Sequence, residues 1–352
     1  MRAPALLATL GLWLTTTAVA EIPRTADGKP DFSGVYDTGT LTPLNRPEVF
    51  GDNQFMTREQ ADQLREQALG RFSFADRESD PNRGAPKKGG DGNNTAGAGN
   101  VGGYNAFWID PGNDTFEIDG KFRTSIIYDP PNGRQPARTP ASLKGLAKAY
   151  ASFGHDNDGT ASWLAYPGPG PFDGPESLAP SERCLISFSA TAPSLPSLYN
   201  NFKRVLQTPD NVMILQEMVH DARVVRMNSE HGPATNRKWL GDSIGYWDGD
   251  TLVVETKNFK AVSGLPGADE NLHVTERFDL LEDGNIVYNF TVDDPTAWVA
   301  PWSGEYLWKR STDKVYEYAC HEGNYAMGNV LRGARLLESE WTGERAEAGS
   351  GE

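Results

Sequence analysis

Four of the five histidines lie in the C-terminal part of the chain, and each has a carboxylate or an arginine close by in the sequence. The histidines are His155, His220, His231, His273 and His321. An imidazole titrates near neutral pH, so it can exchange a proton with a substrate when a neighbouring group orients it. This part of the chain is therefore where we expect acid–base chemistry.

The first cluster runs from Glu217 to Arg223 and includes His220 and Asp221. Strand alternation places Glu217 on an apolar face. An unpaired carboxylate there has a raised pKa, as a general acid or base needs. The alternative is an ion pair between Glu217 and Arg223 across a hairpin.

The second cluster runs from Glu270 to Arg277. In a regular strand His273 and Arg277 share a polar face, which lines the interior of a barrel or faces water. Glu276 lies on the opposite, mostly apolar face. It needs a partner there, and no neighbour in the sequence clearly supplies one.

The third cluster is Tyr316–Tyr325, where Tyr318 precedes His321 and Glu322. A histidine beside a carboxylate at a strand end is a plausible acid or base. The alternative is a solvated strand end.

We predict that His220, His273 and His321 surround one cavity. The predicted catalytic residues are His220, His273, His321, Glu217, Asp221, Glu276 and Glu322, and the predicted substrate-binding residues are Arg223, Arg277, Tyr318 and Trp239. Arginine would hold an anionic group. Trp239 belongs to a group of aromatic residues of which a subset could line a pocket for a flat aromatic or sugar-like molecule.

The sequence motifs indicate neither a metal nor a nucleotide cofactor. There is no H-x-H, H-E-x-x-H or C-x-x-C spacing, so no metal ligand is assigned, although histidines holding a divalent metal remain a less favoured alternative. No G-x-G-x-x-G or Walker-type loop follows a predicted strand. We therefore expect no cofactor.

The N-terminus predicts export. Residues 1–20 contain Arg2, a short apolar run and Ala18-Val19-Ala20, which is typical of a signal peptide cleaved after Ala20. The apolar run is shorter than the roughly 20 residues that span a membrane. No later segment is apolar enough to do so. We expect a periplasmic or secreted protein.

Charge and cysteine content agree with this location. The net charge of −15 disfavours binding to nucleic acid or anionic lipid, so the expected partner is a small molecule; the sequence does not indicate an oligomeric state. Cys184 and Cys320 are the only cysteines. A disulfide is favoured in an oxidising compartment, over a catalytic thiol or a metal ligand.

The chain before residue 202 is rich in loops. We expect a strand near Phe32–Tyr36, a helix that begins with a capping box at Thr57 and Gln60, a strand at Thr124–Tyr128, and a helix from Thr139-Pro140 to about Tyr150. Residues 76–103 are dominated by Gly, Asn and Asp, which predicts a mobile loop or a lid.

Strand patterns dominate from Phe202 onward. Three hairpins are predicted, around His220-Asp221, around Asp248-Gly249 and at Glu282–Asn285, followed by strands at Gly304–Lys309 and Val315–Cys320. We predict a mainly β (β-rich α+β) fold, in which an antiparallel meander forms a lipocalin-like barrel or half-barrel. A two-sheet sandwich is the alternative.

The predicted organisation has four parts. They are a signal peptide (1–20), a loop-rich segment with two short helices packing on the barrel (21–201), the barrel (202–335) and a flexible tail (336–352).

Several motifs resemble those of a family of exported bacterial proteins, most of which have no assigned function. They are Arg123–Arg134, Glu182-Arg183-Cys184, His220–Arg223, Gly249–Thr256 and Tyr316–Tyr325. The resemblance covers residues 30 to 335 and implies export and a single unit. It brings no catalytic assignment. Residues 76–103 form a longer segment than that family would lead us to expect.

Two functions fit these observations. The favoured one is a cofactor-free exported enzyme, a lyase, isomerase or hydrolase, that uses acid–base chemistry on a small aromatic or sugar-like molecule. The alternative is a non-catalytic periplasmic protein that binds such a molecule in an aromatic-lined barrel.

Overall fold

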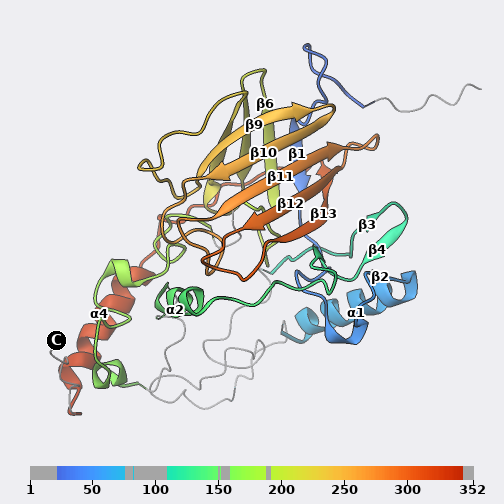
Figure 1. Cartoon of the computed structure of the whole chain (residues 1–352). Coiled ribbons are helices and arrows are strands. Elements are labelled where there is room, and N and C mark those ends of the chain that lie inside the picture. Colours follow the sequence, from blue (N-terminus) through green and yellow to red (C-terminus); the bar gives the residue numbers. More distant parts are fainter. Residues whose placement is uncertain are drawn as a thin grey trace, which may run out of the picture.

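The computed structural model describes residues 22–75, 82, 109–149, 151, 159–187 and 192–343. The predicted signal peptide, almost all of 76–103, His155 and the end of the tail lie outside these residues. The body of the molecule is a closed barrel of nine strands (Figure 1). Its strands are β1 (Gly34–Asp37), β6 (Phe202–Gln207), β7 (Asn211–Gln216), β8 (Ala222–Met227), β9 (Asp242–Asp248), β10 (Thr251–Lys257), β11 (His273–Leu280), β12 (Ile286–Asp293) and β13 (Trp302–Ser311). The prediction of a β-rich barrel is confirmed.

Strand β1 closes the barrel, because it pairs with β6 on one side and with β13 on the other. The segment before residue 202 therefore supplies part of the barrel wall. It also supplies β5 (Ile127–Asp129), which pairs with the beginning of β13, beside β1 on the same edge. The strand predicted at Thr124–Tyr128 is displaced to these residues.

All three predicted hairpins form, but the barrel is not a simple meander. Strands β8 and β9 are parallel, with Val225 opposite Ser243. Residues 228–241 carry the chain back along the barrel between them, since a parallel pair needs a crossover connection. The β9–β10 hairpin turns at Gly249-Asp250, where Gly249 has a φ of 63°, a conformation that glycine adopts without a steric penalty.

The strand predicted at Val315–Cys320 does not form. The edge of β13 that faces away from β12 is paired with β1 and β5, so these residues have no strand edge there to pair with. They have no regular secondary structure. The backbone N–H of Tyr316 donates to the Glu217 carboxylate at 3.0 Å.

Three helices lie toward one end of the barrel in Figure 1: α1 (Arg58–Ala75), α2 (Pro140–Ala149) and α4 (Ala326–Glu340). The capping box of α1 is present, with Thr57 N–H donating to Gln60 Oε1 and Gln60 N–H to Thr57 Oγ1. Thr139 Oγ1 caps α2 by accepting from Ser142 N–H. Helix α4 was not predicted, and it crosses the boundary at residue 335 where a flexible tail was expected.

Smaller elements complete the chain. A short sheet contains β2 (Phe55–Met56), β3 (Glu117–Ile118) and β4 (Lys121–Arg123), and the 3-10 helices are η1 (Glu48–Phe50), η3 (Ser162–Ala165), η4 (Pro175–Ser177) and η5 (Met218–His220). No helix among the described residues has the length and apolar character needed to cross a bilayer.

The barrel interior holds the main core. Burial alternates along β11 and β12, as expected for strands with one face inside and one outside. Aromatic rings fill much of the space. Tyr288 lies 4.9 Å from Trp308 and 5.0 Å from Phe278 between ring centroids. The rings leave the few polar side chains on the inner face surrounded by apolar groups.

The disulfide is confirmed. Cys184 and Cys320 are bonded, with their Cα atoms 5.9 Å apart, and the bond ties the chain after β13 to the segment that follows η4. A disulfide between two cysteines 136 residues apart is compatible with an exported protein.

Candidate functional site

A buried ion pair occupies the inner face of the barrel. Arg223 on β8 forms a bidentate pair with Glu276 on β11, and the two side chains are 3% and 0% exposed. Tyr288 on β12 donates its hydroxyl to Glu276 Oε1 at 2.7 Å, and Arg223 also donates to Thr256. Arg223 is thus the partner of Glu276 that could not be identified from the sequence. The alternative pair between Glu217 and Arg223 is not formed.

The network keeps Arg223 and Tyr288 in their protonated forms. Burial alone would lower the pKa of Arg223, but Glu276 holds it above its ordinary value. Burial, together with the charge of Glu276, raises the pKa of Tyr288 well above its usual range. A guanidinium, a carboxylate and a phenol that satisfy one another are stable but poor at exchanging protons. The network therefore has a structural role, and removing one of its members would leave a buried charge without a partner.

Lys203 on β6 is the other buried cation of the interior. Its side chain is 0% exposed and its Nζ has no hydrogen-bond partner among the described residues. Burial lowers its pKa to about 7, even though Glu217 and Asp221 act in the opposite direction. Sequence analysis missed this residue. Had β6 been delimited, alternation would have placed Lys203 on the buried face with Val205.

Glu217 and Asp221 are buried at the end of the barrel where β7 turns into β8. Glu217 accepts from Tyr316 N–H, and Asp221 accepts from Ser187 N–H at 2.8 Å. Burial raises the pKa of the Asp221 carboxyl. These two predicted site residues lie close enough to Lys203 for their charges to act on it.

The three histidines do not share a cavity. His220 is exposed in η5, where Nδ1 lies 3.0 Å from Tyr318 O. His273 begins β11 on the outer face, 3.8 Å from Glu255 Oε2, while His321 is exposed after the disulfide. The expectation of one histidine-lined cavity is therefore wrong. The histidines occur on different strands and loops, and alternation turns His273 outward.

The remaining predicted residues also lie on the outside or at the rim. Arg277 faces outward and pairs with Asp248 at 2.9 Å. Glu322 is exposed beside His321, and Tyr318 is half-buried next to His220. The polar face of β11 thus faces away from the barrel interior.

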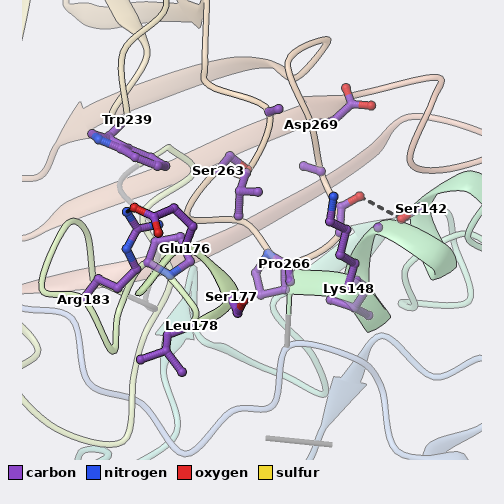
Figure 2. A pocket seen from close by; sticks show the side chains of 18 of the residues that line it. Ser142, Lys148, Glu176, Ser177, Leu178, Arg183, Trp239, Ser263, Pro266 and Asp269 are labelled. Atoms are coloured by element: carbon purple, nitrogen blue, oxygen red, sulfur yellow. Dashed lines mark hydrogen bonds and ion pairs between the residues drawn. The ribbon is translucent and has the colours of Figure 1, made fainter. Parts of the chain in front are cut away.

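A cleft of about 330 Å³ lies beside α2. Its walls are α2, the segment from η4 to Arg183, Trp239 and residues 261–269. In Figure 2, Trp239, Arg183 and Glu176 lie toward one end of the cleft, and Lys148 and Asp269 toward the other. Each end therefore presents one cation and one anion.

The centre of the cleft is less polar than its ends. Leu178, Ser263 and Pro266 lie there in Figure 2. Ser142 of α2 donates to Gly267 O at 2.7 Å, which joins the helix to the 261–269 loop and fixes the width of the cleft. Arg183 and Glu176 are 4.0 Å apart, a weak pair that leaves both groups able to contact a ligand.

Trp239 is held in place from outside the cleft. Lys260 Nζ lies 4.6 Å from the ring centroid, so a cation covers part of the indole. Trp239 is the predicted substrate-binding residue that the structure places in a cleft. Arg183 and Lys148 were not predicted as binding residues, because they come from loop and helix segments distant from the histidine clusters.

Metal binding gains no support from geometry. Among the residues that the structure describes, no group of three or more His, Cys, Asp or Glu side chains is arranged to hold an ion.

No protein-family model matches the chain, and no curated protein shows significant similarity to it.

Proposed function

We propose that this protein is an exported binding protein for a small, ring-bearing molecule of aromatic or sugar-like character, held in the cleft beside α2. The observation that carries the proposal is the composition of this cleft. One tryptophan and several aliphatic groups line it, with an opposite pair of charges at each end.

The size of the cleft limits its ligand. A volume of about 330 Å³ is near the lower end of the roughly 300–1,000 Å³ typical of small-molecule sites, so one or two rings fit. A ring can stack on the face of Trp239 that Lys260 leaves free. Hydroxyl or carboxylate substituents can reach Arg183 at one end and Lys148 at the other.

Two observations favour binding over acid–base catalysis: the residues that line the cleft, and the positions of the predicted catalytic residues. Its described lining contains no histidine or cysteine. The acidic and basic groups expected to perform catalysis are engaged in the barrel interior or lie at the rim. The favoured function from the sequence, an acid–base enzyme built on three histidines, loses its main support.

The test is a screen of the purified protein against phenolic acids and mono- and disaccharides by isothermal titration calorimetry. Trp239→Ala should weaken binding of any hit by about 10- to 30-fold, because a stacked aromatic anchor contributes around 1.5–2 kcal/mol. Trp239→Phe should restore most of this loss.

Tyr166→Ala is the matched control, since Tyr166 is an aromatic side chain that is 72% exposed outside the cleft. It should bind as the unmodified protein does. Hits whose affinity is unchanged in Trp239→Ala would place the ligand elsewhere, and no hits in either panel would reject the ligand class.

A further inference from the structure

Lys203 is placed where a lysine is costly. It points into the barrel between two cross-strand neighbours, Tyr36 on β1 and Gln216 on β7. Its side chain is fully buried, and no described group accepts a hydrogen bond from Nζ. The nearby tyrosine is already engaged, since Tyr36 donates to Phe32 O and accepts from Arg310. The Lys203 amine is therefore buried without a hydrogen-bond partner among the described residues.

The other buried cation of the interior provides the contrast. Arg223 is paired on both guanidinium arms with Glu276, as a structural buried charge should be. Three carboxylates act on the charge of Lys203, and each accepts a hydrogen bond from a backbone N–H group: Glu217 from Tyr316, Asp221 from Ser187 and Asp37 from Gly39. A buried amine that lacks a hydrogen-bond partner and is shielded from water is the arrangement used for nucleophilic lysines.

We propose that Lys203 is a nucleophilic amine that captures small aldehydes or ketones as a Schiff base inside the barrel. The inference is independent of the cleft, because it uses different residues on a different part of the molecule. Its ligand class is a compact carbonyl compound, since the surrounding inner face is filled by aromatic rings.

The chemistry needs no cofactor. The unprotonated Nζ attacks the carbonyl carbon and forms an N–C bond, and a proton passes from nitrogen to oxygen to give a carbinolamine. The C–O bond then breaks as water leaves, and the imine remains. Asp221 or Glu217 can carry the proton between the two atoms. Lys203 can be unprotonated near neutral pH because burial lowers its pKa to about 7.

A ligand would enter from the end of the barrel that carries η5, because Glu217 and Asp221, whose charges act on Lys203, lie at that end. Asp221 is 8% exposed there, and the neighbouring His220 is exposed. This end of the barrel is also where the Cys184–Cys320 bond lies, with Cys320 two residues after Tyr318.

The experiment is reductive trapping. The folded protein is incubated with acetaldehyde or dihydroxyacetone and sodium cyanoborohydride at pH 7, and the modified lysines are identified by peptide mass spectrometry. Lys203 should be modified at least 10-fold faster than Lys257, an exposed lysine on the outer face of β10. Denaturing the protein first should remove this advantage.

Three variants make the result specific. Lys203→Met should lose the fast-labelled product, whereas Lys257→Arg should retain it. Asp221→Asn should slow labelling of Lys203 by 10-fold or more if the carboxyl transfers the proton. Labelling confined to exposed lysines in the folded protein would overturn the proposal. This outcome is independent of the ligand screen, which monitors Trp239.

Discussion

The barrel interior and the cleft beside α2 use the same kinds of charged residue in opposite ways. In the interior, Arg223 and Glu276 are removed from water and bonded to each other. In the cleft, Arg183 and Glu176 are 4.0 Å apart, and Glu176 is 82% exposed along its side chain. A buried charge needs its partner for the fold to remain stable, whereas a charge left open to solvent can contact a ligand. Burial therefore separates the two roles better than residue type does.

The largest effect should come from breaking the interior pair. Glu276→Gln leaves the Arg223 guanidinium buried without a counter-charge, which should cost about 3–5 kcal/mol of unfolding free energy. Urea denaturation followed by circular dichroism measures the change. If the unfolding free energy of the variant falls by less than about 1 kcal/mol, the interior ion pair is not needed for stability, and the contrast with the cleft fails.

Lys203 should make stability depend on pH in the alkaline range. Its pKa is about 7 in the folded protein and 10.5 as a free side chain. Between these values the unfolded chain binds a proton that the folded chain lacks, so stability rises with pH. From pH 7 to pH 9.5 the folded protein should gain about 3 kcal/mol relative to Lys203→Met. Parallel stability curves for the two proteins would contradict a neutral buried lysine.

Asp242 is intermediate between the buried charges of the barrel interior and the exposed charges of the cleft. It is buried, but it lies at the start of β9, where the crossover segment 228–241 ends. Burial raises its pKa, yet hydrogen bonds from Lys238 and Gly232 prevail and lower it to about 2. Its stabilisation is complete above pH 3.8 and is lost as the pH falls toward 2, amounting to about 2 kcal/mol. Asp242→Asn should remove this part of the acid transition, which denaturation at pH 2 to 5 would detect.

The smallest effect should come from the outer face of β11. Arg277 follows Glu276 directly in the sequence but pairs with Asp248 in solvent. Arg277→Gln should cost less than about 1 kcal/mol, because exposed ion pairs contribute little. The comparison with Glu276→Gln uses two neighbouring positions on one strand. If Arg277→Gln lowered the unfolding free energy as much as Glu276→Gln, side-chain burial would not determine how much an ion pair contributes to stability.

Local patterns predicted much of the fold. The capping box of α1, the hairpin predicted around Asp248-Gly249 and the alternation along β11 each depend on residues close together in the chain, although the hairpin turns one residue later than predicted. The same alternation indicated that Glu276 needed a partner. It could not identify Arg223, which is 53 residues away and reaches Glu276 only once the barrel closes.

The candidate site was harder to predict for the same reason. Proximity in sequence grouped each histidine with its neighbours, but adjacent residues on a strand point to opposite faces. His273 consequently faces outward, while Glu276 faces inward. The cleft combines Trp239 with a helix and a loop that no local pattern connects. Lys203 was missed because the alternation of β6 was not recognised.

Hydrogen–deuterium exchange with a ligand from the calorimetric screen tests the central claim most directly, because it locates the bound molecule without a mutation. A ligand bound in the cleft should slow exchange in α2 and in residues 261–269, with little change in β11 to β13. Protection confined to the barrel strands, with α2 and residues 261–269 unchanged, would contradict it and would place the ligand inside the barrel.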